Sequence, residues 1–462
     1  MDRIESTYPT FIESRYCSSP VQRADVDVLL IGAGINLSMV SYLLAQAKRA
    51  GKQLNIVVAD AGPMDLLTHM AHTTIPRRPF IAAGAMERFG GKLPFFGVST
   101  PRPLEEFLRR WPYDYGMLNA RFAAMEEEMG VNDAIPKSGS VLQNSLLTKL
   151  KKEFPDKPVF SAPLAINRDG RRWCPLDQVP SLVGQGVRLL AHFRVKSLRA
   201  VDGRIVEVTG EWLDGRSWTL RPSVVVLGVG VEESLPLLRQ ICCEPLRLET
   251  ADHLRIDLHG SLPPGAFGQA AIDDLGVAVL LMQCRSRQHR IPYHLEIKVA
   301  PRDLWSRGFM PSGDNLRGDF NEAEIWIQVQ AISAMHDRFP PADLLNVEGI
   351  PPVMSSRDAT LHGEIVEVMQ QVAATIGLSN PTFSFRPLLT NHHTYGALRV
   401  GKAVTPEFRF RDLENLYVMP PTAFVDMDDD ANPVLKSRVL AQFAVDDIVN
   451  RWDRKNQFAV TT

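Results

Sequence analysis

The stretch Val26–Gly34 reads VDVLLIGAG, and the fold prediction starts from it. It is a near-continuous apolar run that ends in glycines, which is typical of a strand buried on both faces of a parallel sheet. The residues after it predict a helix with Leu37 and Val40 on one face, and a second apolar strand, Leu54–Ala59, leads to Asp60. This succession predicts a β-α-β unit of the dinucleotide-binding type.

The glycine turn between the first strand and the helix predicts where a cofactor binds. Gly32 and Gly34 are the first two glycines of G-x-G-x-x-G, and Leu37 stands at the third. The first glycine permits a tight turn, and the second lets the backbone approach a pyrophosphate at the positive end of the helix. We count Asn36, in the same turn, among the cofactor-binding residues, and expect Asp60 to accept hydrogen bonds from ribose hydroxyls. The motif alone leaves both NAD and FAD open.

Further along the chain the pattern changes from buried strands to alternating ones. A hairpin is predicted from Arg204–Glu211 and Ser217–Arg221, followed by a buried strand, Val224–Leu227, with its own glycine turn at Gly228 and Gly230. Beyond residue 251, apolar and polar residues alternate in 293–299 and 324–332, which is typical of half-buried antiparallel strands. Residues 363–376 predict an amphipathic helix. We therefore expect an α/β protein whose second domain has its own sheet.

Composition excludes several classes of partner. The chain has 462 residues, enough for two or three domains, and a formal net charge of -2. This near-neutral charge gives no reason to expect nucleic acid or an anionic membrane as partner. The five cysteines form no C-x-x-C pair, and Cys242 and Cys243 are adjacent, so we expect a reducing compartment and no metal site. No signal-peptide pattern opens the chain, and we expect a cytoplasmic protein.

Several separated segments together resemble the glucose–methanol–choline (GMC) family of FAD-dependent oxidoreductases, most closely its short bacterial members. Their order and spacing match the family over nearly the whole chain. The segments are the glycine turn, Phe89–Lys92 with Pro101–Pro103 and Trp111-Pro112, Val224–Leu238, Asp252–Leu254, His393–Gly401, Asn415–Val418 and Asn432-Pro433.

The resemblance implies FAD as cofactor and a discontinuous, Rossmann-like FAD-binding domain made of residues 1–250 and 390–462. Residues 251–389 would form an α+β substrate-binding domain with a mainly antiparallel sheet. The resemblance further implies that Gly90, Gly91, Gly228 and Gly230 contact the cofactor and that the backbone of Val195 touches the adenine.

Other positions refine how the cofactor would be held. The resemblance places Asn432 and Pro433 near the pyrimidine edge of the flavin. Phe95 stands where some members carry the histidine that binds FAD covalently, so noncovalent FAD is expected. The chain departs from the family pattern at Pro420 and Thr422, where the family has aspartate and serine.

The resemblance also implies a pair of catalytic residues, His393 and Asn432. Oxidising an alcohol removes a hydroxyl proton while hydride leaves the carbon for flavin N5, and histidine is the side chain that titrates near neutral pH. His393 would act as the base, with His392 as its competitor, and Asn432 would hold the substrate oxygen. The acidic run Asp426–Asp430 is interpreted as a solvated turn, the alternative being a contact for a cationic substrate.

The predicted function is therefore hydride transfer from a C–H bond, most simply that of an alcohol, to FAD. The partners expected are a small-molecule substrate and an electron acceptor that is oxygen, a quinone or a protein. Alternative functions remain on the same scaffold, namely a non-redox lyase, a desaturase-like enzyme, or a degenerate flavin-binding scaffold protein.

Overall fold

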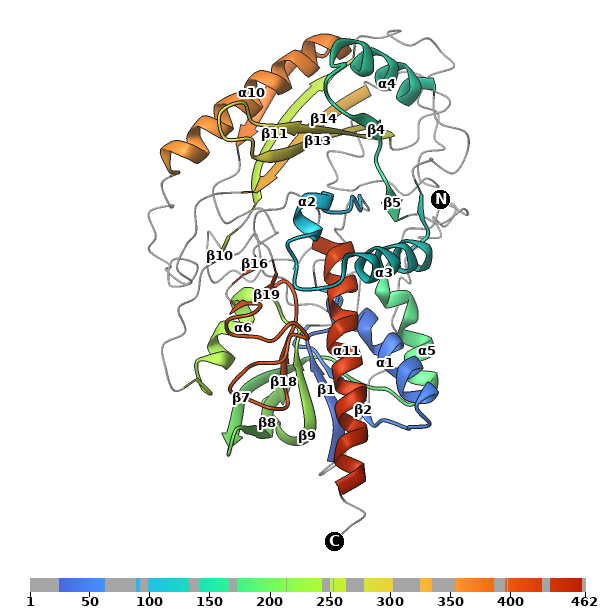
Figure 1. Ribbon diagram of the computed structural model, residues 1–462, viewed down its shortest axis with the longest axis vertical. Coiled ribbons are helices and arrows are strands. Elements are labelled where there is room, and N and C mark those ends of the chain that lie inside the picture. The colour runs from blue at the N-terminus through green and yellow to red at the C-terminus, as the bar shows by residue number, and fades with distance from the viewer. Residues whose placement is uncertain are drawn as a thin grey trace.

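The computed structural model divides into two halves, each built around its own sheet (Figure 1). One half holds a mixed sheet with the glycine turn, and the other holds an antiparallel sheet. The structure describes residues 25–62, 89–91, 99–132, 141–165, 173–212, 214–242, 250–251, 253–262, 278–301, 325–334, 354–385, 395–396, 398–425 and 433–458.

The mixed sheet is mainly parallel and has the order β6-β2-β1-β9-β8-β7, with β18 paired to β9. Its parallel pairs run β6 to β2, β2 to β1, β1 to β9 and β9 to β18, whereas β7, β8 and the start of β9 are antiparallel. Its strands are β1 (Asp25–Ile31), β2 (Ile56–Ala59), β6 (Arg188–Leu190), β7 (Phe193–Val201), β8 (Arg204–Trp212), β9 (Ser217–Leu227) and β18 (Leu416–Val418).

The strands that the sequence predicts in this sheet are confirmed, with one change; β6 and β7 were not predicted. The hairpin forms as expected, but its second strand and the buried strand after it are one continuous strand, β9. The first part of β9 pairs with β8, and residues from Arg221 onward pair with β1. A single strand can join a solvent-facing hairpin to a buried sheet because its apolar residues alternate in the first part and run continuously in the second.

Helices cover the mixed sheet and bring the two ends of the chain together. Helix α1 (Leu37–Arg49) buries Leu37, Val40 and Leu43 and packs against the long α11 (Pro433–Phe458). Helix α11 also packs on α3 (Tyr115–Glu128), whose N-cap Asp114 accepts a hydrogen bond from Met117 N. In Figure 1, α11 runs from the boundary between the halves down along the mixed sheet. Its N-terminal end is therefore near that boundary.

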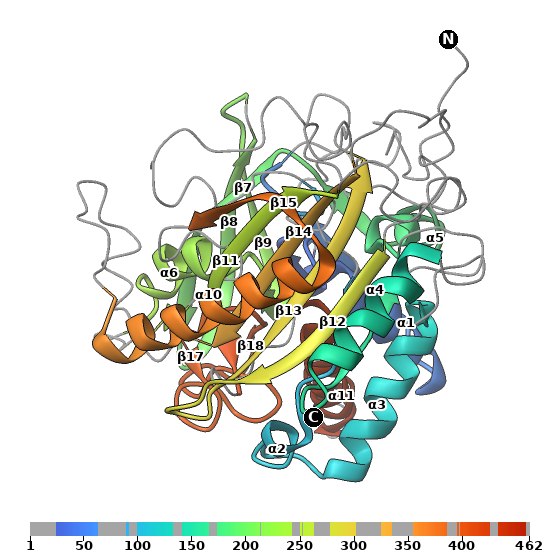
Figure 2. The same ribbon diagram turned by 90° about the horizontal axis from the view of Figure 1, so that it is seen from above.

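The antiparallel sheet has the order β15-β11-β14-β13-β12-β4. Helix α10 (Ser356–Ile376) lies across one face of it, and α4 (Val141–Glu153) packs beside α10 (Figure 2). The Ser355 side chain caps α10 at its start, and left-handed Gly377 ends it. The strands are β4 (Val159–Ser161), β11 (His253–Ser261), β12 (Ala278–Arg285), β13 (Pro292–Pro301), β14 (Ile325–Ala334) and β15 (Ser379–Phe385).

Two features of this half differ from the sequence prediction. Strand β4 and helix α4 precede residue 250 yet lie with the antiparallel sheet. The strands are also buried on both faces, not on one, because His294, Glu296 and Lys298 are as buried as the apolar residues between them. Alternation of polar and apolar residues indicates two different faces, but it does not say that the polar face meets water.

Shorter elements complete the described residues. They are α2 (Glu105–Leu108), β3 (Val131–Asn132), β5 (Leu164–Ala165), the 3-10 helix η4 (Pro175–Gln178), α5 (Val179–Gly184), α6 (Val231–Leu238), β10 (Thr250–Ala251), β16 (Tyr395–Gly396), β17 (Leu398–Arg399) and β19 (Ala423–Phe424). Within the described ranges, no helix combines the length and the apolar character that crossing a bilayer requires.

The chain is thus an α/β protein with a mixed, mainly parallel sheet and a separate antiparallel sheet. The expected fold class is confirmed at this level.

Candidate functional site

The glycine turn lies at the end of β1, between the ends of β2 and β9. Gly32 donates a hydrogen bond from its backbone N to Ala59 O at 2.7 Å, and Gly228 N donates to Ile31 O at 2.8 Å. Gly32 has φ of +96°, and a Cβ built on it would lie 2.8 Å from Gly228 O. Only glycine satisfies both the left-handed backbone and this close approach. The position therefore requires glycine for packing alone.

Gly34 is different, because the described residues leave space in front of it. A Cβ on Gly34 would meet no atom of the described part of the chain within 4 Å. The Gly90-Gly91 segment lies against the same turn, since a Cβ on Gly91 would be 3.6 Å from Gly34 Cα. Gly90 and Gly91 both have positive φ, at +95° and +54°. Two predicted cofactor segments that are far apart in sequence thus meet at the N-terminus of α1.

Asn36 is buried and ties three strand ends together. Its side-chain Nδ2 donates to Pro420 O at 3.0 Å, and a Cβ on Gly228 would come within 2.9 Å of that nitrogen. Its Oδ1 accepts no hydrogen bond from the residues that the structure describes. Asn36 is the N-cap of α1 but makes no side-chain cap bond. Its Nδ2 therefore has a structural role, while its buried Oδ1 can accept from a ligand.

Asp60, at the end of β2, holds the glycine turn through two backbone hydrogen bonds. Its Oδ2 accepts from Ala33 N at 2.7 Å, and its Oδ1 accepts from Gly62 N at 2.8 Å. A carboxylate oxygen can accept more than one hydrogen bond. The contact with Ala33 places this carboxylate beside the turn, as the dinucleotide motif predicts.

Val195 is linked to the same corner through β7. Phe193 N donates to Asp60 O at 2.9 Å, so the start of β7 adjoins the end of β2. The pairing of β7 with β8 shifts register between Val195 and Ser197. The side chain of Gln240 bonds to backbone atoms of Lys196 and Leu198, on either side of Ser197. Val195 thus lies two residues after Phe193, which contacts Asp60, and at the start of a β-bulge.

Gly230 caps the next helix, α6, beside the end of β18. It has φ of +87° and is the N-cap residue of α6. Ser234 Oγ contacts Thr422 Oγ1 at 3.0 Å in the buried interior. Thr422 is one of the positions where the chain departs from the GMC pattern, and here its hydroxyl joins α6 to the segment after β18.

Arg438 is a buried residue close to the glycine turn that the sequence analysis did not single out. It lies on α11, buried, and its Nε donates to Ser38 Oγ at 3.1 Å in the first turn of α1. Its Nη2 donates to Glu128 at 2.7 Å, and its guanidinium lies 4.6 Å from the ring centroid of Trp173. Burial lowers the pKa of Arg438, and Glu128 partly opposes this. Within the described ranges Nη1 has no hydrogen-bond partner.

Two features contribute positive potential at the start of α1. The helix N-terminus carries partial positive charge, and Arg438 adds a full charge that is buried where water screens it weakly. Glu128 is 42% exposed, so solvent weakens its field. No local pattern around residue 438 could have indicated the contact with Ser38, because the two residues are 400 positions apart in the sequence.

The two predicted catalytic residues, His393 and Asn432, lie outside the described residues, as do His392 and Asp426–Asp430. Their described neighbours in the chain do meet. Tyr395 follows His393 by two positions, and Lys436 follows Asn432 by four. The Nζ of Lys436 lies 5.7 Å from the ring centroid of Tyr395.

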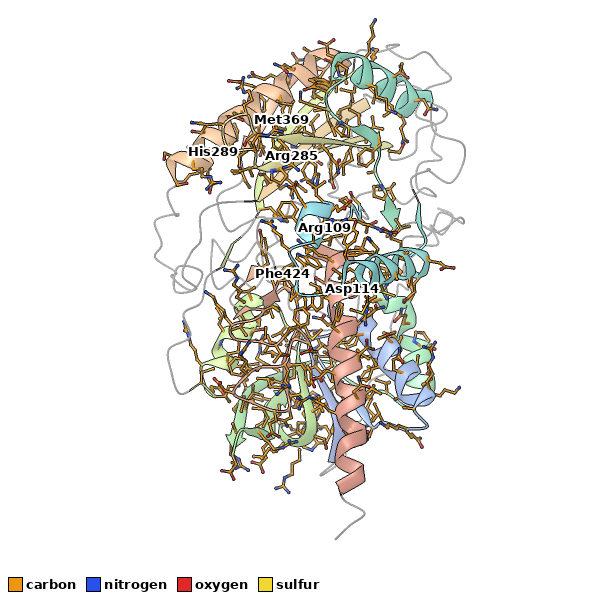
Figure 3. All side chains as sticks on the ribbon, viewed as in Figure 1. Arg109, Asp114, Arg285, His289, Met369 and Phe424 are labelled. Carbon is orange, nitrogen blue, oxygen red and sulfur yellow. The ribbon has the colours of Figure 1, made fainter. Side chains whose placement is uncertain are left out.

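These neighbours form a buried aromatic cluster. Lys436 Nζ is 4.8 Å from the ring centroid of Phe424, and Phe424 lies below the antiparallel sheet, on the mixed-sheet side of the molecule (Figure 3). The Tyr395 ring lies 5.2 Å from that of His253 and 5.4 Å from that of Phe424. Pro433, three residues before Lys436, begins α11. Four segments far apart in sequence converge here, at the boundary between the halves.

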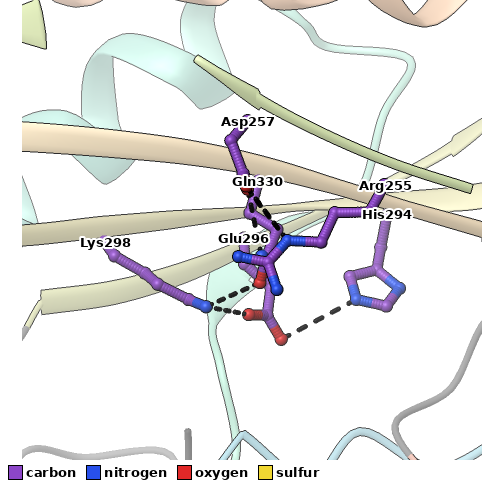
Figure 4. A network of polar contacts seen from close by, with 6 residues as sticks. All are labelled: Arg255, Asp257, His294, Glu296, Lys298 and Gln330. Atoms are coloured by element: carbon purple, nitrogen blue, oxygen red, sulfur yellow. Dashed lines mark hydrogen bonds and ion pairs between the residues drawn. The ribbon is translucent and has the colours of Figure 1, made fainter. Parts of the chain in front are cut away.

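The antiparallel sheet holds a buried charge network that the sequence analysis did not predict (Figure 4). Lys298 Nζ lies 2.8 Å from Glu296 Oε2 and donates to Gln330 Oε1 at 2.8 Å. Gln330 Nε2 donates in turn to Asp257 Oδ1 at 3.0 Å, and Arg255 Nε contacts Asp257 Oδ2 at 3.1 Å. Two ion pairs are thus joined through one amide, across β13, β14 and β11.

The neighbours of Glu296 in this network set its pKa. Glu296 is 2% exposed and Lys298 is 6% exposed. Burial by itself raises the pKa of Glu296, but Lys298 and His294 outweigh it and hold the pKa well below its ordinary value. Glu296 is therefore a buried carboxylate that stays ionised.

No model of a known protein family matches this chain, and no curated protein matches it. The arrangement of the residues themselves therefore carries the functional argument.

Proposed function

We propose that the chain binds FAD noncovalently and oxidises a CH–OH group, as a member of the GMC oxidoreductases. One observation carries the proposal. The described residues leave a space in front of Gly34 in the glycine turn, bordered by Gly91 and close to the buried guanidinium of Arg438.

The described residues fit a dinucleotide. A pyrophosphate needs hydrogen-bond donors, positive charge and close backbone approach. The N-terminus of α1 and Arg438 supply the first two, and the two glycines permit the third. Asp60 would take the adenosine ribose and Val195 the adenine. The parallel strand order β6-β2-β1-β9-β18 also supports a Rossmann-like fold.

The other end of the cofactor would reach the boundary between the halves. Pro433 and the N-terminal end of α11 lie there, next to the cluster of Tyr395, Phe424 and Lys436. A bound flavin supplies the hydride acceptor. The discontinuous FAD-binding domain proposed from the sequence is supported by β18 and α11, which join the mixed sheet from the C-terminal part.

Two side chains would contact the hydroxyl group of the substrate. His393 would take the hydroxyl proton, and Asn432 would donate a neutral hydrogen bond to the oxygen. General-base help of this kind contributes about 10²–10⁴ in rate. The convergence of their chain neighbours, Tyr395 and Lys436, supports this pairing.

The first test is cofactor content. Purified protein is expected to show the visible absorption of oxidised flavin, or to acquire it when apoprotein is titrated with FAD. Acid precipitation should release the colour into the supernatant, because Phe95 offers no nitrogen for covalent attachment. Protein that stays colourless and takes up NAD in place of FAD would refute the proposal.

The second test is anaerobic flavin reduction. A panel of alcohols, sugars and amines is mixed with the holoprotein, and bleaching of the flavin is followed by stopped flow. His393→Ala should retain FAD and lose bleaching by about 10² or more, while His392→Ala serves as the matched control. Equal losses in both variants would contradict the assignment of the base.

A further inference from the structure

The turn between β6 and β7 folds around the end of β2, where Asp60 lies. Asp60 N donates to Leu190 O at 2.9 Å, and Phe193 N donates to Asp60 O at 2.9 Å. Between these two contacts, His192 N donates to Gly62 O at 3.1 Å. Three backbone hydrogen bonds therefore fix His192 beside the residue whose carboxylate holds the glycine turn.

His192 has a backbone conformation that is unfavourable for its residue type. Its φ is +55°, in the left-handed region, where the Cβ of an L-residue lies too close to the following carbonyl oxygen. The turn needs this conformation, because the successive N–H groups of His192 and Phe193 bond to the same short loop. Glycine would adopt it without the steric cost. The turn by itself therefore does not require an imidazole.

The imidazole of His192 also lacks a polar contact. Its Nδ1 is buried and has no hydrogen-bond partner within the ranges that the structure describes. A nitrogen that loses water without gaining a partner is destabilising. The residue is only half-buried, so it lies at the rim of this corner and not in the core. Backbone strain and an unpaired nitrogen are thus two costs that no described contact of the side chain offsets.

A ligand can offset such costs. Strained residues and unsatisfied polar groups occur preferentially at ligand-binding positions, where binding supplies the missing interaction. The ligand expected at this corner is the adenosine part of a dinucleotide, with Asp60 on the ribose and Val195 on the adenine. His192 lies between these two positions, directly before the contact of Phe193 with Asp60 and three residues before Val195. A neutral imidazole offers one donor and one acceptor, and a ribose hydroxyl can pair with either.

We propose that the imidazole of His192 forms a hydrogen bond with the adenosine of the bound dinucleotide, which makes His192 a cofactor-binding residue outside the glycine motif. The proposal rests on the proposed function for the place of the adenosine. It concerns the part of the cofactor that FAD and NAD share, and it is therefore independent of the flavin.

Binding is tested with ADP, which carries the adenosine and two phosphates but no flavin. Dissociation constants are measured by calorimetry on the full-length apoprotein. His192→Gly should weaken ADP binding about three- to tenfold, the equivalent of one neutral hydrogen bond. The same variant should unfold at the same urea concentration as the wild type or a higher one, because glycine relieves the left-handed strain. A residue that serves only the fold would not give weaker binding without a loss of stability.

The variant His192→Asn separates the imidazole from the backbone. Asparagine tolerates the left-handed conformation but is shorter than histidine, so ADP binding should weaken as it does in His192→Gly. Wild-type ADP affinity in His192→Asn would assign the effect to the turn and overturn the proposal. Unchanged ADP affinity in His192→Gly, or a lower urea midpoint, would overturn it as well.

Asp202→Gly is the matched control. Asp202 is exposed and has φ of +48° in the turn after β7, so glycine relieves the same kind of strain at the opposite end of that strand. ADP affinity should stay at the wild-type value in this variant. A comparable loss would show that the effect is not specific to His192, which would also count against the proposal.

The outcomes separate this proposal from the proposed function. Protein that takes up NAD in place of FAD, and whose ADP affinity falls in His192→Gly, refutes the flavin enzyme and keeps the role of His192. Protein that holds FAD and is bleached by substrate, with unaltered ADP affinity in His192→Gly, refutes the role of His192 and leaves the proposed function standing.

Discussion

Asp60→Asn should weaken both the fold of the glycine turn and the binding of FAD. The substitution keeps the size of the side chain and removes its charge. In the native protein the two carboxylate oxygens accept from Ala33 N at 2.7 Å and Gly62 N at 2.8 Å. The asparagine oxygen can accept only one of these, and its amide group then faces the other N–H.

The expected cost follows from these two contacts. A hydrogen bond to a charged group contributes about 1.5–3 kcal/mol, and one of the two is lost. We therefore expect the free energy of unfolding of the apoprotein to fall by about 2 kcal/mol. FAD affinity should fall by a further tenfold or more, because the ribose loses a charged acceptor.

The assay is urea unfolding of the apoprotein, followed by FAD titration of the same samples. Asp27→Asn is the matched control, since Asp27 Oδ2 accepts from Asn55 N at 2.7 Å in an exposed position. Its effect on unfolding should stay within about 0.5 kcal/mol, with unchanged FAD affinity. A destabilisation by Asp60→Asn no larger than that of the control would show that the carboxylate does not hold the turn.

Three further predictions test the site and the network. Gly32→Ala should destabilise the apoprotein by about 2 kcal/mol or more, because a Cβ would lie 2.8 Å from a backbone oxygen at positive φ. Gly34→Ala should leave urea unfolding unchanged and weaken FAD binding. The reverse pattern would contradict the proposal that the cofactor binds in front of Gly34. Arg438→Lys should lower FAD affinity measured by fluorescence titration, because lysine offers no fork of donors to span Ser38 and an anion; unaltered affinity would exclude Arg438 from the anion site. Because the folded-state pKa of Glu296 is depressed below its ordinary value of 4.5, its stabilisation is complete above that value and lost as the pH falls through the folded pKa. Urea midpoints measured from pH 5 downward should therefore fall more steeply for the wild type than for the double variant E296Q/K298Q. Parallel curves would show that ionised Glu296 does not contribute to the stability of the fold.

Local signals predicted the mixed-sheet half well. The VDVLLIGAG run, the helix after it and the strand before Asp60 form contiguous elements, and their apolar periodicity is strong. The helix at 363–376 was also predicted. Its start at Ser356 was missed by seven residues, because its first two turns carry few apolar residues. The alternation in 293–299 correctly indicated a strand, β13.

The sequence by itself determined the β-α-β unit, its glycine turn and the two kinds of sheet, because each depends on residues close together in the chain. Only the tertiary structure decided that Gly91 lies against Gly34, that Arg438 reaches the first turn of α1, and that Glu296 is buried in a charge network. Such contacts join segments separated by tens to hundreds of residues, as between Gly91 and Gly34, Arg438 and Ser38, and Lys298 and Gln330. A periodic pattern reveals which residues share a face, whereas what covers that face is set by packing between elements that the pattern does not connect.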